Sequence, residues 1–306
     1  MVKEKSMNSK NQSKIKLCAG DRVFYSVVNI LMFLILLVVI IPILNVISSS
    51  LSDSKMVMQG KVFLLPKEFS LEGYKVVFAN KSIVNGYLNT IFYTVVATVL
   101  NIVVTLMCAY PLSRQDLVGR NYFMFFFTFT MLFSGGIIPT YLLMRDLHLI
   151  DNRLVMILPG ALSVYNMIVA RTFFQTNIPK ELLEAAKVDG CQNIAFIIKI
   201  VIPLSKPIIA VLSLYYAVAH WNAYFSAFLY LNNPDKFPLQ LVLREILIAN
   251  SLSAEMLVSE SERIQNDMSE VLKYSSIIVA CLPIWLVYPM IQKYFVKGVM
   301  LGSIKG

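Results

Sequence analysis

The chain contains six apolar segments that are each long enough to cross a lipid bilayer as a helix. A spanning helix needs about 20 residues, because each residue rises about 1.5 Å and the hydrocarbon core is about 30 Å thick. Only 15% of the residues are charged and 57% are hydrophobic, whereas a soluble domain has about 25% charged residues. The sequence therefore predicts an all-α polytopic membrane protein with six transmembrane helices. The predicted spans cover residues 25–47, 87–112, 122–143, 154–174, 207–231 and 274–295.

Charged residues are divided unequally between the two sets of segments that flank these spans. With the N-terminus inside, the inner segments hold 16 of the 27 Lys and Arg residues but six of the 18 acids. Cytoplasmic segments of membrane proteins carry such an excess of Lys and Arg. The sequence therefore predicts a multi-pass protein of the cell membrane with both termini in the cytoplasm.

This orientation divides the chain into tails, loops and one transmembrane domain. Residues 1–24 are predicted as a cytoplasmic N-terminal tail, 25–296 as the six-helix domain and 297–306 as a cytoplasmic C-terminal tail. An inner loop covers 175–206, and two outer loops cover 48–86 and 232–273. Loops of this length usually carry function or contain their own secondary structure.

Several function classes lack their sequence signatures. The net charge of +9 comes from basic residues beside apolar spans, without an aromatic-interleaved basic patch, so we expect no nucleic-acid partner. No GxxxxGK[ST] motif is present, so the chain is not its own ATPase by that route. The four cysteines form no CxxC pair and no metal-type spacing with histidine. We therefore expect no metal and no cofactor bound by this chain.

The inner loop contains a compact cassette of helix-forming and helix-breaking residues. Pro179 suits a first helical turn, and Gly190 suits a left-handed stop after that helix. Asn193 is placed to cap a second short helix, which Pro203 is expected to end. Small residues within the cassette permit close approach of a backbone. Two readings remain open at this point: docking into a groove of a partner protein, or a helix lying flat on lipid.

The cassette resembles the EAA motif of ABC importer permeases. The match runs from Glu184-Ala185-Ala186 through Gly190 to Pro203, with Ile202 where leucine is usual. In that family the cassette is a coupling helix that inserts into a separate ATP-hydrolysing subunit. The resemblance implies a type I ABC importer permease fold and favours docking over lipid contact. The residues that it assigns to ATPase coupling are Glu181, Glu184, Ala185, Ala186, Asp189, Gly190, Ile200 and Pro203.

Other stretches resemble the permeases of carbohydrate importers, particularly the maltose-type second permease. They lie at residues 109–114, 133–141, 220–222, 238–240 and 294–298. The resemblance implies import of an oligosaccharide or related carbohydrate by alternating access. It also implies a second homologous permease, two copies of an ATPase subunit that hold ATP and Mg, and an extracellular solute-binding protein. The alternatives are an ABC permease for a non-sugar solute and, with less support, a secondary transporter, which would need ion-coupling carboxylates within its spans.

Polar residues within the spans are the candidates for a substrate path. His220-Trp221-Asn222 lies in the fifth predicted span, and Asn89 lies in the second. Polar groups at membrane depth usually face a bundle interior or a cavity. Trp221 could stack on a sugar ring while Asn222 binds its hydroxyls, but hydrogen bonds between helices are an equally ordinary role for such residues. Asn101 and Asn166 are weaker candidates of the same kind.

A group of charged residues lies in the predicted outer loop between the third and fourth spans. It consists of Arg145, Asp146, His148, Asp151 and Arg153. A metal or catalytic role would use His148 together with the acids. A solvated loop that faces the binding protein is the simpler interpretation, and the one we expect.

Overall fold

The computed structural model describes residues 18–255 and 260–299, and its secondary structure in that part of the chain is helical apart from one isolated bridge between Ser52 and Phe69. Four of the helices, α1 (Ala19–Ser50), α4 (Lys81–Ser113), α11 (Lys206–Trp221) and α14 (Glu260–Val299), pack in the pairs α4–α11, α11–α14 and α1–α14. The others are α2 (Ser54–Met58), α3 (Glu72–Ala79), α5 (Arg120–Leu132), α6 (Ile137–Asp146), α7 (Val164–Asn177), α8 (Lys180–Val188), α9 (Asn193–Phe196), α10 (Ile202–Leu204), α12 (Phe225–Tyr230) and α13 (Leu239–Glu255).

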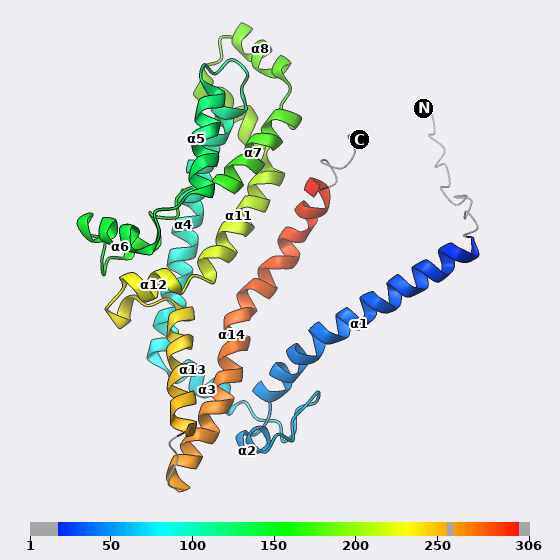
Figure 1. The fold of residues 1–306 in the computed structure, drawn as a ribbon, viewed down its shortest axis with the longest axis vertical. Helices are drawn as coiled ribbons and strands as arrows, with labels where there is room; N and C mark the ends of the chain where they lie inside the picture. The colour runs from blue at the N-terminus through cyan, green and yellow to red at the C-terminus, as the bar shows by residue number, and fades with distance from the viewer. Residues whose placement is uncertain (1–17, 256–259, 300–306) are drawn as a thin grey trace, which may run out of the picture.

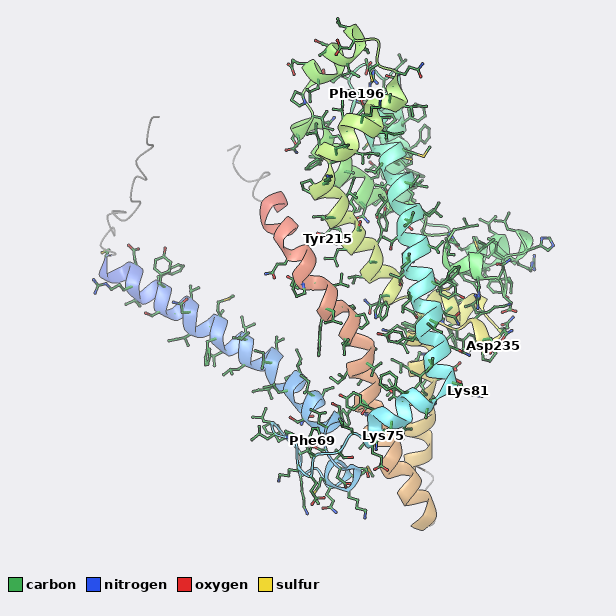
Figure 2. All side chains as sticks on the ribbon, turned by 180° about the vertical axis from the view of Figure 1, so that it is seen from behind. Phe69, Lys75, Lys81, Phe196, Tyr215 and Asp235 are labelled. Carbon is green, nitrogen blue, oxygen red and sulfur yellow. The ribbon has the colours of Figure 1, made fainter. Side chains whose placement is uncertain are left out.

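Helix α4 is the central element of an elongated bundle (Figure 1). Helices α7 and α11 pack along one half of it, α13 and α3 pack against the other half, and α14 packs against α11, α13 and α3. We call the two ends of the bundle the α8 end and the α13 end. Figure 2 shows Phe196 near the α8 end, with Lys81 and Asp235 towards the α13 end.

Each half of the bundle has its own hydrophobic core. Near the α8 end, Tyr110, Phe174 and Phe196 are buried together with Met167 and Leu212. Near the α13 end, the buried group includes Tyr93, Trp221, Tyr230, Leu239 and Val279. The spans 81–113 and 206–221 contribute to both cores, which makes α4 and α11 the mechanical link between the two ends.

Three described helices are long and apolar enough to cross a membrane, namely Gly20–Ser50, Lys81–Ser113 and Val271–Pro289. They correspond to the first, second and sixth predicted spans. Two bent pairs of helices raise the number to five if each pair counts as one span. The predicted count of six is therefore not confirmed by the described helices.

The third predicted span, 122–143, is not one straight helix. Helix α5 ends at Leu132, and α6 begins at Ile137 after a bend of 110°. Gly136 has φ +86° and ψ −179°, a conformation that is essentially restricted to glycine. The Gly135-Gly136 pair breaks the helix, so the prediction of a continuous span was wrong here.

The fourth and fifth predicted spans are also interrupted. Residues 153–156 form a short 3₁₀ turn, and the 14-residue helix α7 begins only at Val164 and runs past the end of the predicted 154–174 segment. Helix α11 ends at Trp221, and the rest of the predicted fifth span holds the separate short helix α12. The apolar composition indicated membrane residence correctly but did not reveal these breaks.

The predicted outer loops contain helices of their own. The segment 48–86 holds α2, α3 and the start of α4, and the segment 232–273 holds α13 and the first turns of α14. Helix α1 meets the bundle near its C-terminal end and diverges from it towards its N-terminus (Figure 1). Its most apolar window is 0% buried by the rest of the chain. Residues 1–17 and 300–306 of the predicted tails lie outside the described part.

Candidate functional site

Helix α8 forms the tip of the bundle, and its ends match the sequence that encodes it (Figure 1). Pro179 is its N-cap, one position before the first turn that we predicted for it, with Glu181 near the positive end and Lys187 near the negative end. At the other end, the Gly190 N–H donates to the Lys187 carbonyl at 3.1 Å, and the Cys191 N–H donates to the Ala186 carbonyl at 2.8 Å. This is a Schellman motif, which requires a left-handed residue. Gly190 has φ +72°, as the sequence predicted.

The second half of the cassette differs from the prediction. Gln192, not Asn193, is the N-cap of α9, and no side chain caps that end. Asn193 instead accepts a hydrogen bond from Arg114 at 3.3 Å, so its polar group ties the cassette to the end of α4. Pro203 lies within α10 and does not end it; the chain turns by 80° at Ser205 before α11 begins.

The coupling residues divide between two faces of the cassette. Ala186 is 6% exposed and packs in the core of the α8 end beside Phe196. Glu181, Glu184, Ala185, Asp189 and Gly190 are all exposed, and Glu184 also lines a pocket behind α8. Three large apolar side chains, Leu182, Val188 and Ile194, are also exposed here. The tip therefore presents a mixed surface of small, acidic and apolar groups, of the kind that fits a protein groove.

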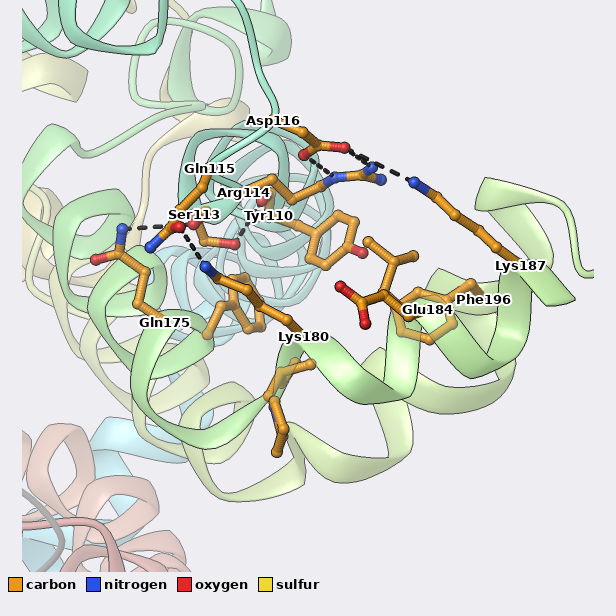
Figure 3. A pocket seen from close by; sticks show the side chains of 14 residues that line it. Tyr110, Ser113, Arg114, Gln115, Asp116, Gln175, Lys180, Glu184, Lys187 and Phe196 are labelled. Carbon is orange, nitrogen blue, oxygen red and sulfur yellow. Dashed lines mark hydrogen bonds and ion pairs between the residues drawn. The ribbon is translucent and has the colours of Figure 1, made fainter.

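A pocket of about 310 Å³ lies behind α8 (Figure 3). Its walls come from the last turn of α4, residues 114–116, the end of α7, α8 and Phe196. The ring of Tyr110 packs edge-to-face on Phe174, with centroids 5.9 Å apart, and lies 6.4 Å from the ring of Phe196. These aromatic contacts join α8 and α9 to α4 and α7, so a displacement of the tip reaches the bundle through packed side chains.

Charged groups link the residues after α4 to α8. The Arg114 Nε donates to Asp116 at 2.8 Å, and Lys187 lies 4.0 Å from the same carboxylate. Lys180 on α8 donates to the side-chain oxygen of Gln115. The hydrogen bonds from Arg114 lower the pKa of Asp116 to about 2, with a smaller contribution from Lys187. Asp116 is therefore ionised at neutral pH and holds two cations in the pocket wall.

The residues that line the pocket are of the types that bind a partner or hold one helix against another. Among the described residues no group of three His, Cys, Asp or Glu side chains is placed to hold a metal ion. Its lining has charged, amide and aromatic side chains, together with Ser113, whose hydroxyl donates to the Tyr110 carbonyl at 2.6 Å. This arrangement positions α8 against α4 and offers a surface to a partner.

At the α13 end, Asn89 fastens a turn to α4. Its amide donates to the carbonyls of Asp235 at 2.7 Å and Phe237 at 3.1 Å. Thr90 accepts the Leu239 N–H at 2.7 Å, and Tyr93 donates to the Lys236 carbonyl at 2.8 Å. Asn89 is 7% exposed. These hydrogen bonds hold a distant segment against α4. A structural role of this kind was one of the two roles predicted for Asn89, the other being a place in the substrate path.

The other candidates for the substrate path have different surroundings. His220 lies 3.3 Å from the Asn101 side-chain oxygen, and Asn101 donates to the Gly160 carbonyl. Trp221 is 6% exposed, donates to the Ala280 carbonyl at 3.0 Å and packs edge-to-face on Tyr87. Asn222 is exposed and lines a cavity. Asn166 is buried in α7. Of the four main candidates, Asn222 and Trp221 each line a cavity, and that of Trp221 is a separate, mostly apolar one of about 160 Å³.

In the charged outer loop, Asp151 connects the loop to the segment that contains Asn232 and Lys236. It has φ +53°, accepts backbone N–H groups from Asn232 and Asn233 at 3.1 and 3.0 Å, and pairs with Lys236 at 2.8 Å. These bonds, Lys236 first, lower the pKa of Asp151. Arg145 pairs with Asp146 instead. The cluster is thus dispersed over two ion pairs and holds no metal-type arrangement in the described residues.

The comparisons with known proteins agree with this geometry. The polygalacturonan/rhamnogalacturonan transport system permease protein YtcP of Bacillus subtilis is 41% identical over 296 residues, which cover 94% of this chain and 99% of the relative. Protein LplC of the same organism is 42% identical over 271 residues, with 88% and 90% coverage. The chain belongs to the permease subunits of carbohydrate ABC importers. No family model matches it.

A solved structure of another ABC transporter contains a chain with the same fold as this permease. The crystal structure of a bacterial ABC transporter involved in the import of the acidic polysaccharide alginate contains a chain with TM-score 0.83 and 35% identity. The match covers 91% of this permease and 99% of that chain. The permease is therefore a multi-pass membrane protein of an ABC importer, and such permeases work with a second permease, an ATPase and a solute-binding protein.

Sequence reasoning missed two groups of residues in this permease. Arg114 and Asp116 were counted only as loop charges, although their spacing of two residues after a helix allows a local pair. Thr90 and Tyr93 were read as span residues, and their partners lie more than 140 positions away in the chain. No local sequence pattern announces contacts of that range.

Proposed function

We propose that this permease moves an oligosaccharide into the cell by alternating access, coupled to ATP hydrolysis in a partner. The observation that carries the proposal is the exposed α8 cassette at the tip of the bundle, with its apolar and small residues turned outward. The relatives named above support a carbohydrate as cargo, because one transports polygalacturonan or rhamnogalacturonan and another structure imports alginate.

The proposed complex has two permeases and two copies of an ATPase subunit, with ATP and Mg bound by the latter. The α8 end faces the cytoplasm, both termini lie there, and the α13 end meets the extracellular binding protein. The distribution of Lys and Arg supports this orientation. The exposed apolar surface of α1 supports contact with lipid and with the second permease.

The geometry suggests how force on α8 reaches the bundle. A push on the outward face acts on Ala186, whose core includes Phe196, Tyr110 and residues of α4 and α11. Packed cores transmit displacement because their interiors are close-packed. Since α4 and α11 also build the core of the α13 end, closure of the ATPases would reorient both ends together.

Purification of the tagged, full-length chain from its native membrane tests the proposal. We expect a second permease and an ATPase to copurify, and we expect a sugar-loaded binding protein to stimulate ATP hydrolysis in proteoliposomes. Glu184→Lys reverses an exposed charge of the cassette, and we expect it to abolish the stimulation while the chain remains in the membrane. A lone homo-oligomer, or normal stimulation in this variant, would refute the proposed function.

A further inference from the structure

A cavity of about 420 Å³ with apolar and polar lining residues lies at the α13 end, between the end of α11, α12, α13 and α14. This volume is within the range of roughly 300–1,000 Å³ that is usual for small-molecule sites. Its polar lining consists of Asn222, Gln240, Arg244, Lys273 and Ser276. Two of these five side chains are cationic, and none of the described residues that line the cavity is acidic. The cavity therefore has the electrostatics of a site for an anion.

Arg244 is held in place by aromatic rings. Its guanidinium carbon lies 4.7 Å from the centroid of the Phe228 ring and 5.6 Å from that of the Tyr224 ring. Stacking of this kind fixes the plane of the guanidinium and leaves its N–H groups directed outward from the plane's edge. Among the side chains that the structure describes, Arg244 forms no ion pair. A fixed guanidinium of this kind matches the two oxygens of a carboxylate.

Ser276 gives an independent indication of a ligand. It lines the same cavity and is 4% exposed. Its buried hydroxyl has no hydrogen-bond partner among the described residues. Buried polar groups without a partner are rare in native proteins and call for an explanation such as a bound ligand. A hydroxyl-rich molecule in the cavity would supply the missing partner.

The cavity adjoins the candidate substrate path. Asn222 directly follows the buried Trp221, and Ala280, whose carbonyl accepts from Trp221, is part of the cavity wall. The Tyr224 side chain is 42% exposed and lines the cavity too. An aromatic face, amides and a cation in one cavity suit a sugar ring that carries a negative charge.

We propose that this cavity is a subsite for a uronic acid residue of an acidic oligosaccharide, with Arg244 binding the sugar carboxylate and Ser276 a sugar hydroxyl. The inference rests on the proposed function and narrows its cargo to an anionic class. The permease then contributes selectivity itself, in addition to the binding protein. The acidic cargo of the alginate importer and of YtcP is consistent with such a site.

Uptake of two matched sugars tests the subsite. The complete importer is reconstituted with its binding protein in phosphatidylcholine liposomes, and uptake of trigalacturonate is compared with uptake of its methyl ester. Dividing the rate of each variant by that of the wild type cancels the preference of the binding protein. We expect Arg244→Gln to lower trigalacturonate uptake about tenfold or more, because a charge-assisted pair is lost, and to leave uptake of the ester within about twofold.

Two further variants sharpen the result. Arg244→Lys keeps the charge but loses the bidentate geometry, so we expect an intermediate loss for the acid alone. Ser276→Ala should weaken uptake of both sugars to a similar, smaller extent. Lys61→Gln, which removes an exposed cation outside the cavity, is the control and should change neither rate.

The possible outcomes separate the two proposals. If the wild-type importer takes up no carbohydrate, the proposed function fails. If it takes up neutral sugars and excludes trigalacturonate, or if Arg244→Gln lowers both rates equally, the uronate subsite is refuted while the proposed function stands. An effect of Arg244→Gln that appears only when anionic lipids are added would assign the cavity to a lipid headgroup and also refute the subsite.

Discussion

The two ends of the permease fasten a chain segment to α4 in contrasting ways. At the α8 end, Arg114, Asp116 and Lys187 form charged contacts, and the Asp116 side chain is 53% exposed. At the α13 end, Asn89, Thr90 and Tyr93 form neutral hydrogen bonds to backbone groups of residues 235–239, and all three are buried. The contacts at the α8 end are therefore charged and partly exposed to solvent, whereas those at the α13 end are neutral and buried.

This difference has energetic consequences. Exposed ion pairs typically contribute about 0–1 kcal/mol and weaken with salt. A buried backbone carbonyl that loses its partner costs about 1–3 kcal/mol. The α8 end can therefore change its charged contacts at little cost, whereas the α13 end holds its turn rigidly. We infer that the α8 end is built to adjust and the α13 end to keep its shape, and three substitutions test that inference.

The largest effect is expected from Asn89→Ala. The substitution removes the donor to two carbonyls, those of Asp235 and Phe237. We expect the free energy of unfolding to fall by about 1–3 kcal/mol, because the Phe237 carbonyl remains buried without this partner. Thermal unfolding of the purified complex measures the change.

Asn232→Ala is the matched control for this position. The Asn232 side chain is exposed, and its contact with Asp151 uses the backbone N–H, which the substitution keeps. We expect its unfolding midpoint to match that of the wild type. Equal midpoints for both variants would contradict a rigid α13 end.

The next effect concerns Gly190, whose φ of +72° ends α8. A Cβ at this position would meet nothing within 4 Å, so Gly190→Ala introduces backbone strain of about 1–2 kcal/mol without crowding in this chain. We expect uptake to fall about tenfold, while the unfolding midpoint of the complex falls less than it does in Asn89→Ala. Gly20→Ala also has open space around its Cβ but lies within α1 at an ordinary φ, and it should leave uptake unchanged. Loss of stability with normal uptake in Gly190→Ala would reverse our assignment of the two ends.

The sequence predicted the elements that depend on local chemistry. The turn at Gly190, the start of α11 at Lys206-Pro207 and the three long apolar helices follow from residue type and spacing, and the structure has all of them. The sequence also contained a signal for the break at Gly135-Gly136, because paired glycines mark a turn. The prediction followed the hydrophobicity of the segment instead and gave one continuous span. The sequence analysis also predicted that Asn193 caps a helix, whereas its side-chain oxygen accepts a hydrogen bond from Arg114.

The rest depended on contacts between distant segments. Asn89 and the 235–237 turn lie about 146 positions apart, and no hydrophobic pattern pairs them. The cavity around Arg244 combines four elements, and its cation–π contacts arise only when α12 returns beside α13. Of the predicted path residues, Asn222 faces that cavity, whereas Asn89 and Trp221 are engaged in hydrogen bonds between helices. Composition identified polar residues at depth but not which way each one points.

The smallest effect is expected from Asp116→Asn, and it probes the charged fastening directly. The substitution removes the carboxylate that holds Arg114 and Lys187. We expect a stability change below about 1 kcal/mol, because the Asp116 side chain is 53% exposed and water screens its ion pairs. ATPase stimulation should differ from that of the wild type at low salt, and the two should converge as salt screens the pair. A difference that persists at high salt would mean that Asp116 acts through shape and not charge.

The pH response of the same residue follows from its lowered pKa. Arg114 lowers the pKa of Asp116 from 3.8 to about 2. A carboxylate whose pKa is lowered by folding stabilises the folded state fully above its unfolded pKa, and this contribution is lost as the pH falls through the folded value. Between roughly pH 5 and pH 8, the ratio of wild-type to Asp116→Asn stimulation should therefore be constant. A ratio that changes within this window would show that a group other than Asp116 sets the pH dependence, because the Asp116 carboxylate stays ionised there both when it is paired with Arg114 and when it has its ordinary pKa of 3.8.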